Sequence, residues 1–291
     1  MIEFANVNDN DEIIRLWKIC FGDSNEYISC FLNKRMNTEN CLVHRENSNI
    51  LSMLFLLEGK LKISSELYNS FYIYAACTDP EYRGRGLMAG LIGRTAEIAV
   101  ENDKDYICLV PANSGLFEYY ARFGFETVFK KKVISFNRRQ LYMLSAESAE
   151  IYNPDIKEIT DLRNMVFSSG DCYLWDEKAV AYSIFENESI GGKMICVRNE
   201  GKLAGYALFF ETDERVIVKE LCVTNRSFGS LIKLLVSSSK SEYFTLNLPV
   251  NFPLTSDNFN IKDNGMAKPI SAKGGKSLQA IYNAYIGLTL E

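Results

Sequence analysis

Apolar and polar positions alternate along the first half of the chain in a way that predicts a mixed α/β fold. Polar residues that can cap a helix, Asp9, Asn10 or Asp11 and then Ser24, precede two stripes of apolar residues at helical spacing. The stripes contain Ile13, Leu16, Trp17 and Cys20, and then Tyr27, Ile28, Phe31 and Leu32. Strands are predicted at residues 2–6, 41–45, 50–58 and 71–77.

The second half of the chain repeats this pattern in a weaker form. Strands are predicted at residues 193–198, 203–211, 215–223 and 243–248, with a helix at residues 227–238. One strand in each half ends in Pro-x-Asn, at Asn113 and at Asn251. We therefore predict two domains, residues 1–142 and residues 143–291, of which the second is a degenerate copy. An unrelated α+β domain in the second half is the alternative.

Composition and charge narrow the classes of protein to which the chain can belong. The 291 residues suit two domains, and a content of 47% hydrophobic and 24% charged residues is that of a globular protein. The net charge of −5 argues against a nucleic-acid partner and suits a cationic amine. We expect no membrane association, because no apolar run reaches ~18 residues and the start of the chain is not a signal peptide.

The cysteines point to a reducing compartment. Eight cysteines are scattered, mostly within apolar runs, without a C-x-x-C pair. This pattern predicts buried thiols in a cytoplasmic protein, with neither a disulfide framework nor a zinc site. The oligomeric state, a homo-oligomer included, is left open.

A basic, glycine-rich loop connects the strand at residues 71–77 to the next apolar-periodic segment. The loop reads Arg83-Gly84-Arg85-Gly86-Leu87-Met88. Glycine allows the backbone to approach a ligand closely, and the first N–H groups of a helix have no partner within the helix. Because the helix dipole and the two arginines add positive charge, the loop predicts a cradle for a pyrophosphate. The second half has Thr224-Asn225-Arg226-Ser227-Phe228-Gly229-Ser230 at the corresponding place.

A second motif follows the strand predicted at residues 105–110. Asn113 lies seven residues before Tyr120, and Tyr120 begins the pattern Tyr-x3-Gly-Phe that ends at Phe125. The two motifs, in this order, resemble the GNAT superfamily of acyl-CoA-dependent N-acyltransferases. A first GNAT domain followed by a copy without a CoA site is similar to the enhanced-intracellular-survival branch. The third, sterol-carrier-like domain of that branch has no room in this chain. The usual Gly or Ala at the sixth loop position is replaced by Met88.

The resemblance implies the GNAT fold, acetyl-CoA as co-substrate, no metal, and a role for each matching residue. The loop would bind the CoA pyrophosphate through the backbone of Arg83, Gly84, Arg85, Gly86, Leu87 and Met88. The pantetheine arm would contact Asn113 and pair with the backbone of Ala76, Cys77 and Thr78, and Tyr120 would lie beside the sulfur. Two structural alternatives stay open: Asn113 as a helix cap, and Tyr120 as a core aromatic like its neighbour Tyr119.

The expected reaction is direct attack of a small-molecule primary amine on acetyl-CoA, with Tyr120 assisting the departure of the thiolate. An alkylamine with a pKa of about 10.4 is almost wholly protonated at pH 7, so a carboxylate or water must accept its proton. The strand at residues 71–77 offers no carboxylate, whereas Glu118 and Glu126 lie near in sequence. The C-terminal carboxylate of Glu291 is a further candidate, because the resembling branch uses its C-terminus in this way. Two alternative functions stay open: a non-catalytic acyl-CoA-binding sensor or scaffold, and a protein or peptide N-acetyltransferase.

Three other features are interpreted as having no catalytic role. The single histidine, His44, falls on a predicted strand, and the run Lys130-Lys131-Lys132 is interpreted as a solvated strand face. The segment Lys273-Gly274-Gly275-Lys276-Ser277 resembles the end of a Walker A loop. Ile270, however, stands where that motif requires its first glycine.

Overall fold

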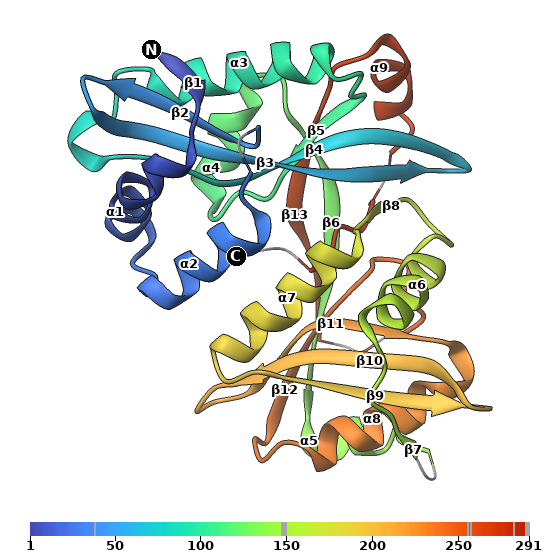
Figure 1. The fold of residues 1–291 in the computed structure, drawn as a ribbon. Coiled ribbons are helices and arrows are strands. Elements are labelled where there is room, and N and C mark those ends of the chain that lie inside the picture. Colours follow the sequence, from blue (N-terminus) through green and yellow to red (C-terminus); the bar gives the residue numbers. More distant parts are fainter. Residues whose placement is uncertain (38, 147–149, 255, 257, 282, 289–291) are drawn as a thin grey trace. The chain divides into compact units, whose positions relative to one another are not determined.

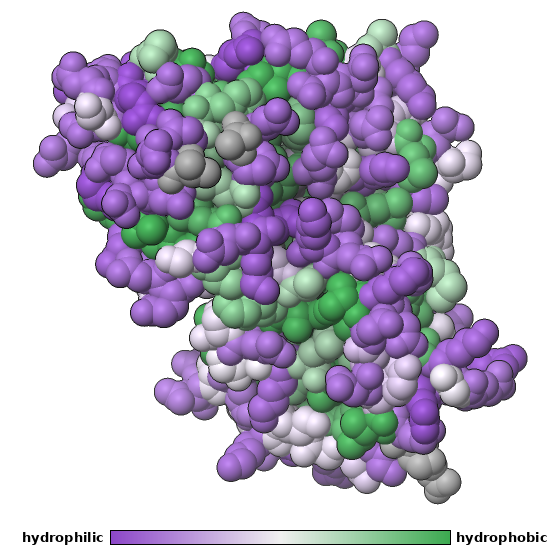
Figure 2. All heavy atoms as spheres, viewed as in Figure 1, coloured by the Kyte–Doolittle hydropathy of each residue, from purple (hydrophilic) through white to green (hydrophobic). Residues whose placement is uncertain are grey.

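The computed structural model describes residues 1–37, 39–146, 150–254, 256, 258–281 and 283–288. The chain forms two compact units (Figure 1). Unit 1 contains Met1–Val128 and Gly265–Ile281, and unit 2 contains Phe129–Asn264 and residues 283–288. Both units are therefore discontinuous in sequence, whereas the boundary after residue 142 stays a prediction. In the view of Figure 2, hydrophilic side chains cover most of the surface of unit 1, and hydrophobic side chains lie between hydrophilic ones on unit 2.

The sheet of unit 1 has the strand order β1–β2–β3–β4–β5–β13. Neighbouring strands are antiparallel, except that β4 and β5 are parallel. The bounds are Ile2–Phe4 (β1), Cys41–Glu46 (β2), Asn49–Ile63 (β3), Glu66–Thr78 (β4), Tyr106–Leu109 (β5) and Phe259–Pro269 (β13). The strands predicted in this half are confirmed, although β3 and β4 extend toward each other beyond the prediction and close a hairpin.

Helices cover both faces of this sheet. On one face, α1 (Asn10–Phe21) and α2 (Asn25–Arg35) form an aromatic cluster with the sheet, in which the ring of Phe31 lies 4.8 Å from the rings of both Phe55 and Tyr74. On the other face, α3 (Leu87–Glu101) and α4 (Ser114–Ala121) pack on Leu54 and Leu56. Side chains alternate along β3 because successive residues of a strand point to opposite faces. The short helices η1 (Val7–Asp9) and η2 (Pro80–Tyr82) complete this part of the unit.

One of the two predicted helix caps is confirmed. The hydroxyl oxygen of Ser24 accepts a hydrogen bond from the N–H of Tyr27 at the start of α2. At α1, Asp9 occupies the N-cap position as predicted, but its carboxylate makes no cap bond to this helix. It accepts instead from the N–H of Asn6 and forms a capping box around η1. The polar cluster thus begins a short 3₁₀ turn that leads into α1.

Unit 2 repeats the order of elements seen in unit 1. The sheet order is β6–β12–β11–β10–β9–β7, and β11 and β12 form a parallel pair, as β4 and β5 do. The strands are β6 (Glu126–Asn137), β7 (Glu150–Ile151), β8 (Cys172–Leu174), β9 (Lys193–Asn199), β10 (Lys202–Glu211), β11 (Val216–Val223) and β12 (Tyr243–Leu248). The helices are α5 (Arg138–Tyr142), α6 (Ile156–Phe167), α7 (Glu177–Ser189), η3 (Asn225–Ser227) and α8 (Phe228–Ser237). The α/β class is confirmed, and no described helix is long and apolar enough to span a bilayer.

Two long strands, β6 and β13, each pair with a strand in the unit that the other half of the chain mainly forms. Residues 132–137 of β6 pair with β12 in unit 2, and residues 266–269 of β13 pair with β5 in unit 1. After β13, the helix α9 (Ala272–Leu278) also belongs to unit 1. The last strand pairing of each unit therefore depends on a segment that is distant in sequence.

A fully buried ion pair organises the interior of unit 2. The guanidinium of Arg163 contacts both carboxylate oxygens of Glu220 at 3.1 Å, and neither side chain is exposed. The hydroxyl of Tyr206 donates a hydrogen bond of 2.5 Å to Glu220. Arg163 also donates to the carbonyl oxygens of Tyr173 and Ile286, which ties the last described residues to α6. The hydrogen bonds compensate for removing both charges from water.

Candidate active site

A bulge in β4 shapes the region in which most of the predicted residues lie. Leu54 of β3 lies opposite both Ala75 and Ala76, and Ala75 adopts a φ of +48°. A bulge of this kind bends the strand and turns it away from its neighbour. Pairing of β4 with β5 accordingly ends at Ile73 and Leu109, although β4 continues to Thr78. We call this divergence of the two parallel strands wedge 1. Ala76, Cys77 and Thr78 lie on its β4 side.

The glycine-rich loop leads from wedge 1 to the start of α3. Gly84 and Gly86 both have a φ of +78°, a conformation that other residues adopt only with strain. A Cβ added at either position would meet no described atom within 4 Å, so the space over the loop is open. Gly86 occupies the N-cap position of α3 without a side-chain cap bond. The first N–H groups of α3 therefore face the side from which an anion can approach.

The charges around the loop favour an anion. Within the described residues, neither Arg83 nor Arg85 has a carboxylate partner. Arg83 donates to the carbonyl oxygen of Thr78 at 3.2 Å, and the guanidinium of Arg85 lies 4.8 Å from the ring centre of Tyr82. The nearby Asp79 carboxylate is paired with Arg15 at 3.1 Å. Two positively charged side chains thus remain available beside the helix start.

The departure from the family pattern at Met88 is accommodated by the core. Leu87 is buried, and Met88 is partly buried against the apolar cluster that α3 forms with the sheet. The larger side chain at this position therefore packs into the unit.

Asn113 caps the helix that carries Tyr120. The side-chain oxygen of Asn113 accepts a hydrogen bond of 3.2 Å from the N–H of Leu116, at the start of α4. This is the structural alternative that the sequence left open, and the described contacts of Asn113 require no other role.

Tyr120 lies at the inner end of α4, with 7% of its surface exposed. Its ring is 5.7 Å from that of Phe125, and burial raises the pKa of its hydroxyl, with smaller contributions from Tyr119 and from the thiol of Cys77. Tyr120 also belongs to the apolar cluster that contains Ile73 and contacts Ala76, both of β4. Tyr119 is more exposed and lies beneath the guanidinium of Arg122, 5.0 Å from its ring centre. Tyr120 is thus a protonated hydroxyl at neutral pH.

Two residues beside wedge 1 were not predicted from the sequence. The hydroxyl of Ser52 donates to the carbonyl oxygen of Cys77 at 2.9 Å, and the thiol of Cys20 donates to that of Thr78 at 3.5 Å. A hydrogen bond with Cys77, helped by Arg83, lowers the pKa of the Cys20 thiol. Ser52 is a polar residue within an apolar strand, and that interruption was a usable signal. Nothing in the local sequence marks Cys20.

The candidate carboxylates for proton removal lie at the surface. Glu118 on α4 and Glu126 at the start of β6 are both exposed. Glu291 lies outside the described residues. His44 is half-buried on β2, and burial lowers the pKa of its imidazole.

The two lysine-containing segments have structural roles. The interpretation of residues 130–132 as a solvated face was wrong for Lys132, which is 8% exposed and donates to the carbonyl oxygens of Phe252 and Leu254. Residues 273–277 lie within α9, where the hydroxyl of Tyr106 donates to the carbonyl oxygen of Gly274.

The corresponding helix start in unit 2 is covered. A Cβ added at Gly229, in the first turn of α8, would lie 2.6 Å from the Cβ of Ala146 and 2.8 Å from its backbone nitrogen. The chain at residue 146 therefore lies where an anion would have to approach. After β12, no helix equivalent to α4 is present among residues 249–254.

Comparison with known proteins finds a family match over the part of the chain that contains the candidate site. Residues 2–128 match the family model of the acetyltransferase (GNAT) domain. No curated protein sequence matches the chain. Among solved structures, the fold is similar to a GCN5-related N-acetyltransferase from Anabaena variabilis, with 16% identity, a TM-score of 0.77, and coverage of 94% of this chain and 74% of the other.

Two further structures show the same fold. A GCN5-related N-acetyltransferase from Kribbella flavida has 15% identity and a TM-score of 0.75, with coverage of 94% of this chain and 72% of the other. Eis1 from Mycobacterium abscessus has 11% identity and a TM-score of 0.70, with coverage of 93% and 74%. The N-terminal part of the chain is a GNAT acetyltransferase domain. This domain accordingly belongs to the acyltransferase class of enzymes.

Proposed function

We propose that unit 1 transfers an acetyl group from acetyl-CoA to a primary amine of a small molecule. The observation that carries this proposal is the open, glycine-lined start of α3, with two guanidinium groups that have no carboxylate partner among the residues described. The loop from Arg83 to Met88 would hold the pyrophosphate through backbone N–H groups. The backbone of Ala76, Cys77 and Thr78, which extends beyond the pairing with β5, would receive the pantetheine arm.

In the proposed reaction, the neutral amine attacks the thioester carbon, the C–N bond forms, the C–S bond breaks, and CoA leaves as a thiolate. Tyr120 would donate a hydrogen bond to that sulfur. A thiol has a pKa of about 8.5 and a free tyrosine about 10, and burial raises the pKa of Tyr120 further. Complete proton transfer is therefore unfavourable, and the role of Tyr120 is to stabilise the thiolate as a donor. The proton of the amine would pass to water, since the nearby carboxylates are exposed.

The acceptor is proposed to be a small molecule because the net charge of −5 favours the approach of a cationic amine. A protein or peptide acceptor would give transfer to peptide amines and none to small amines. A CoA-binding sensor would bind acetyl-CoA without turnover.

The test measures transfer of labelled acetyl groups to a panel of small amines and peptides, together with calorimetric binding of acetyl-CoA. We expect transfer to small primary amines and one acetyl-CoA per chain. Gly86→Val should reduce the affinity for acetyl-CoA at least tenfold, because the side chain enters the open loop at a φ of +78°. The control, Gly93→Ala in α3, also has open space around it and a helical backbone. Binding of two molecules per chain, or an unaffected Gly86→Val variant, would contradict the assignment of the loop.

A further inference from the structure

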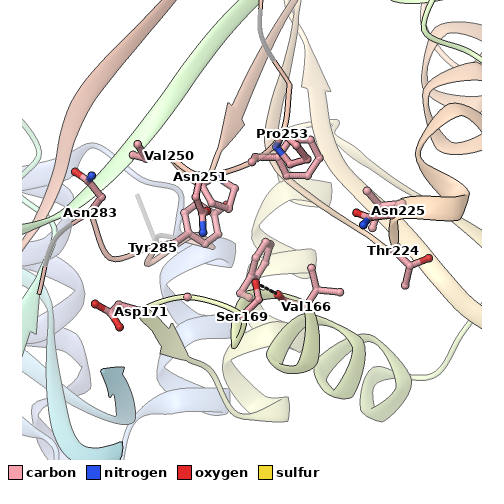
Figure 3. A pocket seen from close by; sticks show the side chains of 15 residues that line it. Val166, Ser169, Asp171, Thr224, Asn225, Val250, Asn251, Pro253, Asn283 and Tyr285 are labelled. Atoms are coloured by element: carbon pink, nitrogen blue, oxygen red, sulfur yellow. Dashed lines mark hydrogen bonds between the residues drawn. The ribbon is translucent and has the colours of Figure 1, made fainter. Parts of the chain in front are cut away.

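Unit 2 contains a cavity of about 640 Å³ that the proposed acetyl transfer does not use (Figure 3). Its wall is formed by the end of α6 with the residues that follow it, the end of β11, the segment after β12, and two residues near the C-terminus. The lining includes Phe167, Asp171, Asn225, Asn251, Phe252 and Asn283. All of the lining residues belong to unit 2.

The cavity occupies the position in unit 2 that wedge 1 occupies in unit 1. Lys219 forms a bulge in β11, because Leu208 pairs with Glu220 and Phe209 with Val218. Parallel pairing of β11 with β12 ends at Val218 and Leu246, although β11 continues to Val223. The two strands therefore diverge after a bulge, as β4 and β5 do. We call this second divergence wedge 2.

The second wedge has lost the means to bind a phosphate. The start of α8 is covered by Ala146, and none of the lining residues that the structure describes is Lys, Arg or His. Arg163 lies behind the wall, 5.2 Å from the ring of Phe167, but its charge is compensated by Glu220. Arg226 follows Asn225 in sequence, is exposed and does not line the cavity.

The groups that do line the cavity favour a cation. The C-terminal end of α6 carries a partial negative charge, and the hydroxyl of Ser169 donates to the carbonyl oxygen of Val166 at this end. In Figure 3, Asp171 and Asn283 lie at one end of the cavity, and Thr224 and Asn225 at the other. Among the described lining residues, Asp171 is the only one with a charged side chain, and the amide oxygens of Asn225, Asn251 and Asn283 can accept hydrogen bonds from an ammonium group.

Apolar surface occupies much of the remaining wall. Phe167, Phe252 and Tyr285 contribute aromatic rings, to which Val166 and Pro253 add aliphatic surface. Aromatic faces attract cations, and a cavity of this size accommodates a small organic molecule. We propose that wedge 2 is a second ligand site, which binds a primary ammonium compound with an apolar body. The same structural wedge would thus serve an anionic ligand in unit 1 and a cationic one in unit 2.

The first experiment locates a heavy-atom probe on the full chain. Crystals soaked with 2-(4-bromophenyl)ethylamine should show anomalous scattering from bromine inside the cavity. In solution, calorimetry should give an affinity for this amine at least tenfold higher than for 2-(4-bromophenyl)ethanol, which has the same body without the charge. Bromine found only elsewhere, or equal affinity for the alcohol, overturns the proposal.

A charge-addition variant assigns the solution binding to unit 2. Asn225→Lys places a positive charge at an exposed lining position and should weaken amine binding about tenfold, as expected for like charges several ångströms apart near a surface. Asn199→Lys adds the same charge at an exposed residue outside the lining and should leave the binding unchanged. Equal affinities in the two variants overturn the proposal. Acetyl transfer measured on the same proteins reports separately on unit 1, so the two proposals fail independently.

Discussion

The hydroxyl of Tyr106 donates a hydrogen bond of 2.6 Å to the carbonyl oxygen of Gly274, which lies 168 residues further along the chain. The backbone carbonyl oxygen of the neighbouring Asp105 accepts a hydrogen bond of 2.8 Å from the N–H of Ile270, and its carboxylate accepts one of 2.7 Å from the hydroxyl of Ser271. These contacts hold β13 and α9 against β5, the strand next to β13 in the sheet of unit 1. Unit 1 is therefore complete only when residues from near the end of the chain are present.

A fragment that ends after residue 142 should be aggregation-prone or inactive. It lacks β13 and α9, so the edge of β5 is left unpaired and the buried ring of Tyr106 loses its cover. Size-exclusion chromatography and an acetyl-transfer assay on the fragment test this expectation. A soluble monomeric fragment with full activity would show that the C-terminal segments are dispensable.

Two adjacent glycines in α9 offer a matched test of the same contact. A Cβ at Gly274 would lie 2.6 Å from the carbonyl oxygen of Asp105, whereas one at Gly275 would meet no described atom within 4 Å. Gly274→Ala should lower the free energy of unfolding by about 1–3 kcal/mol. Gly275→Ala should raise it by about 0.5–1 kcal/mol, because alanine is the better helix former. Urea denaturation of both variants measures the difference, and equal effects would mean that α9 does not pack on β5.

Tyr120→Phe should lower turnover by about 10²–10³ with little change in the affinity for acetyl-CoA, because it removes a hydrogen-bond donor and keeps the ring. The control is Tyr119→Phe, whose ring is more exposed and stacks under Arg122. Since burial raises the pKa of Tyr120, the wild-type rate should not fall with deprotonation of this hydroxyl until well above pH 10. Equal losses in the two variants would identify Tyr120 as a core aromatic.

Buried thiols should make the protein sensitive to alkali. Burial raises the pKa of Cys41, Cys77, Cys108, Cys196 and Cys222, in the case of Cys196 to about 12. The unfolded chain releases these protons above about pH 8.5 and the folded chain does not, so stability is lost as the pH rises. At pH 9.5, each of these thiols should lower the free energy of unfolding by about 1.4 kcal/mol.

Urea denaturation between pH 7 and 9.5 measures this loss. Cys196→Ala should reduce the decline by about the contribution of one thiol. An unfolding free energy that is unchanged up to pH 9.5 would contradict the explanation.

The loop and most strands could be predicted from local spacing, whereas features that depend on contacts between distant residues could not. The loop from Arg83 to Met88 is a contiguous string whose backbone conformation glycine dictates. The helix α6 was not predicted, because Arg163 interrupts its buried stripe and its charge is compensated by Glu220, which lies 57 residues away. The first residues of β4 were missed because Glu66, Leu67 and Asn69 are exposed.

In the candidate active site, too, contacts between residues distant in sequence could not be predicted. The pairing of Asp79 with Arg15 and the contact of Cys20 with Thr78 join residues about 60 positions apart, which no local pattern shows.

Because β13 completes the sheet of unit 1, the order of synthesis determines when unit 1 of the newly made chain can finish folding. The partner of β5 is synthesised some 160 residues after β5 itself. At 5–20 residues per second, a ribosome needs about 10–30 s to produce it. During that time the nascent acetyltransferase domain has an open strand edge, of the kind that chaperones bind and that neighbouring chains on a polysome can capture. The N-terminal domain of this protein therefore cannot finish folding first.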